Sequence, residues 1–289
     1  MIQHANRFDD GEAYERFMGA WSQLAGQVFL DWLSPATGQR WIDVGCGNGA
    51  FTELLVQRCA PAETQGIDPS EALISFARTR PGARGAAFRP GDAMALPFAA
   101  DSFDAAVMAL VIFFVPDPAT GIAEMVRVVR PGGMVAAYAW DALGGGSPHE
   151  PVQAEMPALG LAPPHPPSAN ASRMEALRRL WLDAALETVE TRQITVQRTF
   201  SSFDDFWNTT TTTGGLKLSL AAVETDLVAE LKERVRARLS TDGLGRVTYG
   251  SRANAIRGQV PKPHHRTRGR AAWRHDDLSQ TVETSVQRY

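Results

Sequence analysis

Residues 40–49 read Arg-Trp-Ile-Asp-Val-Gly-Cys-Gly-Asn-Gly, and the interpretation of the whole chain begins with them. Its first half is apolar and typical of a buried strand, and the glycines that follow open a helix. Glycines at such a turn let the backbone approach a ligand closely, because no Cβ is in the way. The N-terminus of the helix also offers free N–H groups and a partial positive charge to an anion. We therefore expect a ligand-binding turn between a buried strand and a helix.

On both sides of this turn, apolar runs alternate with segments of helical periodicity. Further strands are predicted at residues 65–68, 86–88, 103–110, 134–140, 188–196 and 246–255. Helices are predicted at residues 12–33, 51–59, 70–77, 119–129, 173–186 and 221–239. Such alternation is typical of an α/β protein whose sheet is covered by helices on both faces. The sequence predicts a Rossmann-like fold with a mostly parallel, seven-stranded sheet and an N-terminal helical cover.

The composition is that of a globular protein and excludes several classes. The 289 residues carry a net charge of −3 and 44% hydrophobic residues, and a dedicated nucleic-acid binder would be clearly basic. The longest apolar run, residues 105–115, is far shorter than the roughly 20 residues that span a bilayer. Two cysteines, Cys46 and Cys59, make neither a disulfide framework nor a zinc site, and no other set of side chains has metal-ligand spacing. We expect a cytoplasmic protein without a resident metal.

The charge is unevenly distributed along the chain. Residues 257–289 hold seven Lys or Arg and three Asp or Glu, a charge of +4, which leaves −7 for residues 1–256. Few large aliphatic residues occur in the basic part, so the sequence predicts a disordered tail at 257–289. The domain predicted at 1–256 divides into a helical cover (1–38), a cofactor-binding core (39–141), a lid or substrate loop (142–172) and a C-terminal part (173–256). The loop is rich in glycine and proline and longer than most connections without regular structure.

A carboxylate strengthens the interpretation of the glycine turn. Asp68 ends the next predicted strand, 19 residues after Gly49. At that place a carboxylate accepts two hydrogen bonds from a ribose diol. An alternative is that Asp68 caps a helix, because Pro69 and Ser70 follow, and Ser70 is itself an N-cap candidate. Together, the glycine turn and Asp68 predict an adenosine-type ligand.

Three more segments, read together with the first two features, carry a family resemblance. They are Gly-Asp-Ala at residues 91–93, Leu-Pro-Phe at 96–98 and Arg-Val-Val-Arg-Pro-Gly-Gly at 127–133. With them the chain resembles class I S-adenosylmethionine-dependent methyltransferases, particularly the small-molecule group that includes the ubiquinone/menaquinone-biosynthesis enzymes. The resemblance covers residues 14–140 closely. Each motif is weak alone, and the combination is specific.

The resemblance implies a role for each matching position. It assigns the methionine part of the cofactor to Asp43, Gly45, Cys46, Gly47, Asn48 and Gly49. It assigns both ribose hydroxyls to Asp68, the border of the adenine to Pro69, the adenine amino group to Asp92 and the adenine ring to the backbone N–H of Ala93. It places Leu110 and Val111 beside the sulfonium, and a helical cover with Tyr14 as a polar contact before the first strand. The alternatives are a turn role for Asp92 and ordinary core packing for Leu110 and Val111.

No catalytic side chain is identified by the sequence. Methyl transfer from a sulfonium is an in-line displacement, so the protein mainly aligns the acceptor and excludes water. A general base is needed only if the acceptor loses a proton, and His149 and His165, in the predicted loop, are candidates. Trp140 and Asp141 are predicted to line the acceptor pocket. Apolar wall candidates, for which core packing is the alternative, are Phe113, Phe114, Phe203, Phe206 and Trp207.

The resemblance implies an S-adenosylmethionine-dependent methyltransferase with a small-molecule acceptor and no nucleic-acid partner. One alternative is a protein that binds the cofactor without turning it over. A second is a nicotinamide-dependent oxidoreductase, because residues 45–50 also fit the dinucleotide pattern G-x-G-x-x-A. A short-chain dehydrogenase would carry Tyr-x-x-x-Lys, and no tyrosine here has a lysine four positions on. The acceptor and the oligomeric state are left open by the sequence.

Overall fold

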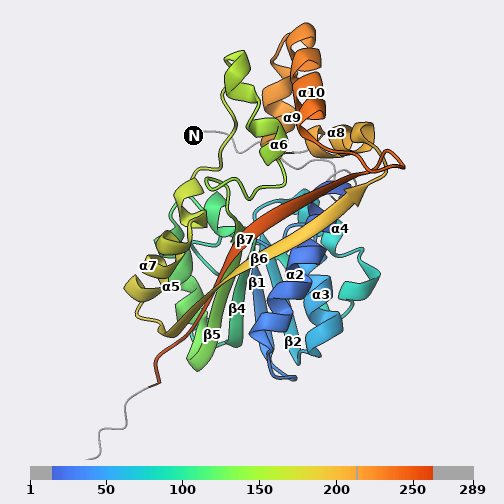
Figure 1. The fold of residues 1–289 in the computed structure, drawn as a ribbon. Helices are drawn as coiled ribbons and strands as arrows, with labels where there is room; N and C mark the ends of the chain where they lie inside the picture. The colour runs from blue at the N-terminus through green and yellow to red at the C-terminus, as the bar shows by residue number, and fades with distance from the viewer. Residues whose placement is uncertain (1–14, 213, 263–289) are drawn as a thin grey trace, which may run out of the picture.

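A computed structural model describes residues 15–212 and 214–262, and its centre is one seven-stranded sheet. The strand order is β3-β2-β1-β4-β5-β7-β6 (Figure 1). The pairs among β1 to β5 are parallel, and β7 runs antiparallel to both of its neighbours. The strands are β1 (Arg40–Val44), β2 (Glu63–Asp68), β3 (Ala86–Pro90), β4 (Phe103–Ala109), β5 (Val129–Trp140), β6 (Glu187–Phe200) and β7 (Val247–Gln259). The predicted fold class is confirmed.

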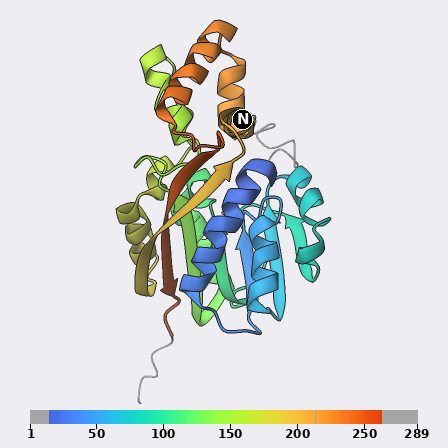
Figure 2. The same ribbon diagram turned by 45° about the vertical axis from the view of Figure 1, so that its right-hand side comes forward.

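Helices cover both faces of the sheet, as Figures 1 and 2 show. On one face lie α2 (Ala20–Leu33), α3 (Ala50–Cys59) and α4 (Glu71–Ala77), and on the other lie α5 (Pro118–Val128) and α7 (Met174–Asp183). Because both faces are covered, the central strand β4 is almost entirely buried, in keeping with its nearly continuous apolar sequence. The sheet and these helices form one main hydrophobic core.

Helix starts follow the local sequence. The Ser70 hydroxyl accepts a hydrogen bond from the backbone N–H of Leu73, which confirms Ser70 as the N-cap of α4. At the start of α5, the Asp117 carboxylate accepts from the backbone N–H groups of Ala119 and Thr120, and a proline occupies the first helical position. These caps fix where the helices begin relative to the strand ends.

A second group of helices lies over the carboxyl ends of the parallel strands (Figures 1 and 2). It consists of α6 (Glu150–Gln153), α8 (Phe203–Thr211), α9 (Gly214–Ala221) and α10 (Thr225–Arg238). We call this group the cap. Ion pairs join its parts, since Arg238 on α10 pairs with Glu150 on α6 at 2.5 Å. Short helical turns complete the fold: η1 (Glu15–Gly19), η2 (Pro81–Ala83), η3 (Ile112–Phe114), η4 (Met156–Leu159) and η5 (Ala169–Ser172).

Two expectations about segment boundaries are corrected. The predicted lid loop, 142–172, contains α6, η4 and η5. A proline stands in the first turn of both α6 and η4, where its missing N–H costs no hydrogen bond, and Val152 and Met156 are buried. The predicted tail begins too early, because β7 continues to Gln259. Arg257 pairs with Ala136 of β5 in the ladder and forms an ion pair with Glu190 of β6 at 2.8 Å. The remainder of that tail, 263–289, lies outside the described residues.

None of the helices in residues 15–212 and 214–262 is long and apolar enough to cross a membrane. The same residues hold no group of three or more His, Cys, Asp or Glu side chains placed to hold a metal ion.

Candidate functional site

The glycine turn lies between the end of β1 and the start of α3. Gly45, Gly47 and Gly49 all have positive φ, at 77°, 54° and 80°, a region that residues with a Cβ seldom adopt. A Cβ added at Gly45 would lie 2.4 Å from Cγ1 and 2.9 Å from Cβ of Val111. Rotation of the valine side chain cannot remove the clash, because it does not move Cβ of Val111, which is itself only 2.9 Å from the added Cβ. The turn therefore requires glycine for both its backbone conformation and its packing.

Asp68, at the end of β2, lies against this turn. Its Oδ2 accepts a hydrogen bond from the backbone N–H of Gly47 at 3.0 Å, and its Oδ1 accepts from the N–H of Ser70 at 2.9 Å. The residue is 8% exposed, and this burial raises the pKa of the carboxyl group, while the two backbone hydrogen bonds act in the opposite direction. Each carboxylate oxygen has a second lone pair, so Asp68 retains capacity for hydroxyl donors.

Asp43, in β1, is the second acid of the site and is buried. Its Oδ2 accepts from the Thr52 hydroxyl at 2.6 Å, whereas its Oδ1 has no partner among the described residues. Burial raises the pKa of Asp43 to about 7, and the hydrogen bond from Thr52 opposes the shift. Nearby, Cys46 is a buried free thiol whose pKa is also raised by burial. The turn is thus surrounded by polar atoms with unused hydrogen-bonding capacity.

The adenine-side candidates lie at the ends of β2 and β3. The backbone N–H of Gly91 donates to the carbonyl oxygen of Asp68 at 3.1 Å, so the two strand ends are adjacent. Pro69 and Asp92 are exposed and Ala93 is half-buried. One Asp92 oxygen accepts from the N–H of Met94 at 2.8 Å, the turn role that the sequence left as an alternative, and this leaves the other oxygen available. Tyr14 lies outside the described residues.

Leu110 and Val111 separate the glycine turn from a cavity. Leu110 has φ 63°, a left-handed conformation that is unusual for a residue with a Cβ and often marks a functional position. Its N–H donates to the carbonyl oxygen of Tyr138 at 2.8 Å, which holds this conformation. The Leu110 side chain lines the cavity, and the neighbouring Val111 packs against Gly45.

A charged cluster that no sequence motif predicts clamps the turn. Arg80, whose side chain is 8% exposed, donates from Nε to the Asn48 carbonyl oxygen at 2.5 Å. Its other nitrogens form ion pairs with Glu53 of α3, at 2.7 Å, and with Glu15 of η1. Glu15 also accepts from the Asn48 side-chain amide at 2.6 Å. Arg80 follows α4 without any periodicity or motif, so only the tertiary contacts identify it.

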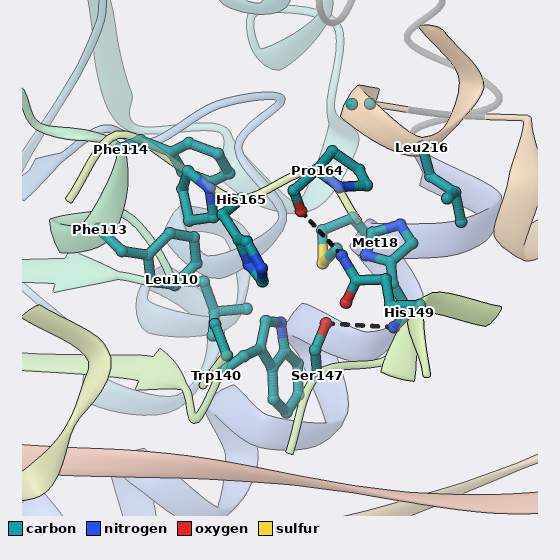
Figure 3. A pocket seen from close by; sticks show the side chains of 15 residues that line it. Met18, Leu110, Phe113, Phe114, Trp140, Ser147, His149, Pro164, His165 and Leu216 are labelled. Carbon is teal, nitrogen blue, oxygen red and sulfur yellow. Dashed lines mark hydrogen bonds between the residues drawn. The ribbon is translucent and has the colours of Figure 1, made fainter. Parts of the chain in front are cut away.

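The cavity lies under the cap and has a volume of about 100 Å³. Figure 3 shows its walls coming from η1, the ends of β4 and β5, the 142–172 segment and α9. Its lining residues are Met18, Leu110, Phe113, Phe114, Trp140, Ala142, Ser147, His149, Gln153, Pro164, His165, Pro166, Gly214, Gly215 and Leu216. Both candidate histidines are included, as are the predicted wall residues Phe113, Phe114 and Trp140.

Four residues predicted to line the acceptor pocket do not line this cavity. Asp141 does not line the cavity, because its carboxylate pairs with Arg252 at 2.7 Å. Phe203, Phe206 and Trp207 do not line it either. They pack with one another in α8, and Phe206 also packs edge-to-face on Phe200 of β6 with ring centroids 5.2 Å apart. Core packing, the alternative interpretation, holds for these three rings.

Comparisons with known proteins agree with this geometry. Residues 42–137 match a family model described as "Methyltransferase domain". The chain is 37% identical over 110 residues to the ubiquinone/menaquinone biosynthesis C-methyltransferase UbiE of Dinoroseobacter shibae, covering 37% of this chain and 44% of that one. It is also 37% identical over 130 residues to the malonyl-[acyl-carrier protein] O-methyltransferase of Methylococcus capsulatus, covering 45% and 46%. The chain thus spans a little under half the length of these curated relatives.

Solved structures extend the similarity of fold beyond this segment. The YcgJ protein of Bacillus subtilis superposes with a TM-score of 0.55 at 15% identity, covering 82% of this chain and 98% of that one. A phosphoethanolamine N-methyltransferase 2 of Haemonchus contortus, solved with S-adenosyl-L-methionine, gives 0.53 at 16% identity, covering 87% and 57%. The chain therefore has the fold of the class I methyltransferases, and residues 42–137 are similar to methyltransferase domains, among them that of UbiE.

Proposed function

We propose that this protein transfers a methyl group from S-adenosylmethionine to a small-molecule acceptor. The observation that carries the proposal is the arrangement around the neighbouring residues Leu110 and Val111. On one side lies a glycine turn hydrogen-bonded to the carboxylate of Asp68, and on the other lies a largely apolar cavity. Methyl transfer needs a cofactor site and an acceptor site that meet at one point, and this arrangement supplies both.

The residues at the turn fit the cofactor. The absence of side chains at Gly45, Gly47 and Gly49, all with positive φ, and the unpartnered Oδ1 of Asp43 both support a ligand there. When bound, S-adenosylmethionine supplies a methyl group already activated on a sulfonium. Under the proposal, the segment Asp43 to Gly49 holds the methionine part, and Asp68 accepts hydrogen bonds from the ribose hydroxyls. Pro69, Asp92 and Ala93 border the adenine.

The remaining work of the protein is to align the acceptor and exclude water. Leu110 and Val111 present apolar surface where the two ligands would meet, and α9 of the cap and the 142–172 segment form further walls of the cavity. An in-line displacement needs little more than such alignment, because no protein nucleophile takes part. Both cysteines are free thiols, and the cavity is apolar, so we extend the proposal to a cytoplasmic location and an acceptor other than nucleic acid.

Two measurements test the proposal in sequence. Titration calorimetry should show S-adenosylmethionine binding to the protein. Asp68→Asn should weaken the binding by about 1–3 kcal/mol, because a buried acceptor of hydrogen bonds is replaced by an amide. Asp183→Asn, at an exposed acid on α7, is the control and should change nothing. Unaltered affinity in Asp68→Asn would contradict the ribose role.

The second measurement separates transfer from binding. A metabolite extract incubated with the protein and methyl-labelled S-adenosylmethionine should yield a labelled small molecule, identified by mass spectrometry. If the cofactor binds and the label stays on it, the protein is a cofactor-binding protein and the proposed enzymatic activity is wrong.

A further inference from the structure

The short segment η1, residues 15–19, contacts both halves of the site. On the cofactor side, the Glu15 carboxylate accepts a hydrogen bond from the Asn48 side-chain amide at 2.6 Å and forms an ion pair with Arg80. On the other side, Met18 lines the cavity (Figure 3). One segment of five residues therefore joins a contact with the glycine turn to a contact with the cavity.

Phe17 extends the contacts of η1 along the cavity wall. Its side chain is fully buried, and its ring centroid lies 4.7 Å from that of His149, a residue that lines the cavity. The Phe17 carbonyl oxygen accepts from Nη1 of Arg198 on β6 at 3.1 Å. Because close-packed rings transmit displacements, the position of η1 affects the 142–172 segment as well as Met18.

Asn48, in the glycine turn, is held by Glu15 both directly and through Arg80. Its side-chain amide donates to Glu15, and its backbone carbonyl oxygen accepts from Nε of Arg80 at 2.5 Å. The side chain of Arg80 is 8% exposed and that of Glu15 is 32% exposed, so water screens their ion pair less than a surface pair. Loss of the Glu15 carboxylate would release the Asn48 amide and would leave Arg80 with Glu53 as its remaining ion-pair partner among the described residues.

Gly19, the last residue of η1, leaves room for the Glu15 carboxylate. A Cβ added at Gly19 would lie 2.7 Å from Cδ of Glu15. The backbone of Gly19 is helical, with φ −58° and ψ −47°, so its conformation does not require glycine, and alanine is the better helix former. The missing side chain at Gly19 therefore serves the placement of Glu15.

Building on the proposed function, we propose that Glu15 is a positioning residue that couples the glycine turn to the cavity. While Glu15 binds Asn48 and Arg80, the turn keeps the conformation that receives the cofactor, and η1 keeps Phe17 and Met18 at the cavity wall. Because coupling between two sites is reciprocal, cofactor binding at the turn stabilises η1 in this position. Cofactor binding therefore prepares the cavity for the acceptor.

Hydrogen exchange, measured by mass spectrometry on the full chain, tests the coupling. In the native chain, saturating S-adenosylhomocysteine should slow exchange about fivefold or more in peptides that contain η1. In Glu15→Ala saturated with the same ligand, this slowing should be lost, and calorimetry should show binding weakened about fivefold or more. Slowing that persists in saturated Glu15→Ala would come from direct contact with the ligand and would overturn the inference.

Two further variants separate positioning from general stability. Gly19→Ala keeps Glu15 but displaces its carboxylate, so it should weaken S-adenosylhomocysteine binding about threefold or more without lowering the Tm. The matched control is Asp31→Ala, because Asp31 forms an exposed ion pair at 2.6 Å between α2 and Arg58 of α3. The control should keep the native affinity and the native slowing of exchange. Native affinity in both Glu15→Ala and Gly19→Ala, or an equal loss in Asp31→Ala, would overturn the inference.

The inference and the proposed function fail separately. If the native chain binds S-adenosylhomocysteine and neither affinity nor exchange depends on Glu15, the coupling alone is refuted. If the coupling is found and no label from methyl-labelled S-adenosylmethionine reaches a small molecule, the coupling stands and the enzymatic activity is refuted.

Discussion

The glycine turn and the cavity lie on either side of Leu110 and Val111, yet they are built in different ways. The turn comes from seven consecutive residues, 43–49, and three of them are glycines whose positive φ and close packing exclude a side chain. The cavity is made of side chains and backbone from residues as far apart as Met18 and Leu216. Local sterics specify the first region, whereas the second exists only when distant segments pack together.

The electrostatics of the two regions differ as well. Asp43, Asp68 and the ion pairs of Arg80 surround the turn, and the cavity is apolar with a neutral imidazole. A common cofactor with fixed polar groups favours a rigid, polar site, and an acceptor that changes between relatives favours a site made of replaceable side chains. We therefore expect substitutions at the turn to reduce cofactor affinity and stability more than substitutions in the cavity.

The largest effect is expected at Gly45. Gly45→Ala should abolish measurable S-adenosylmethionine binding, at least a hundredfold loss by calorimetry, because the new Cβ meets Cβ of Val111 at 2.9 Å. Gly38→Ala is the matched control, since Gly38 also has positive φ, at 74°, but nothing lies within 4 Å of its added Cβ. The control should lose about 1 kcal/mol of stability from backbone strain and keep its affinity. Normal affinity in a folded Gly45→Ala would remove the contrast between the two regions.

The next effect concerns the clamp on the turn. Arg80→Met should lower the free energy of unfolding by about 2–4 kcal/mol, because it leaves the carboxylates of Glu15 and Glu53 without their buried partner. We also expect roughly tenfold weaker cofactor binding, since the Asn48 carbonyl group loses its donor. The control is Arg58→Met, which breaks an exposed ion pair with Asp31 and should cost less than about 1 kcal/mol in urea unfolding. Unchanged cofactor affinity would mean that local sequence alone holds the turn.

The pH dependence of stability should have opposite signs in the two regions. The pKa of Asp43 is raised to about 7, so the folded state binds more protons than the unfolded state between pH 4 and 7, and its contribution to stability falls as the pH rises. The pKa of His149 is lowered to about 4, so the unfolded state binds more protons between pH 4 and 6.5, and its contribution rises with pH.

Urea unfolding of two variants across pH 4–8 separates these contributions. At pH 8, the free energy of unfolding of Asp43→Asn should exceed that of the native chain by about 2–4 kcal/mol, and this difference should shrink toward pH 4. His149→Phe should show the opposite trend. Its free energy of unfolding relative to the native chain should be highest near pH 4 and should fall by about 1–3 kcal/mol by pH 8. Parallel pH curves for the two variants would contradict the assignment of opposite charge states to these sites.

The smallest effect is expected at the mouth of the cavity. Phe114, which lines the cavity, is 38% exposed. Phe114→Ala should change the free energy of unfolding by no more than about 1 kcal/mol and leave cofactor affinity within twofold of the native value. A tenfold loss of cofactor affinity would show that cofactor binding depends on the cavity side chains as well as on the glycine turn.

Most of the fold could be predicted from the chain, and the acceptor side could not. The alternation of strands and helices and the N-cap at Ser70 follow from periodicity and local hydrogen bonding. Periodicity does not show that β7 lies antiparallel between β5 and β6, nor that it extends to Gln259. The predicted tail therefore begins three residues too early. Strand order depends on pairing between distant segments, and no local pattern encodes it.

The candidate site divides in the same way. The glycine turn, the acid at Asp68 and the strand ends before Asp92 and Leu110 are predictable from the chain, because backbone sterics and strand endings are local properties. That Arg80 clamps the turn, that Phe203, Phe206 and Trp207 belong to the core, and that Trp140 Nε1 and His149 Nε2 are buried without partners follows from the folded structure. Burial and hydrogen-bond satisfaction depend on which distant residues surround a group, and those neighbours come together only when the chain folds.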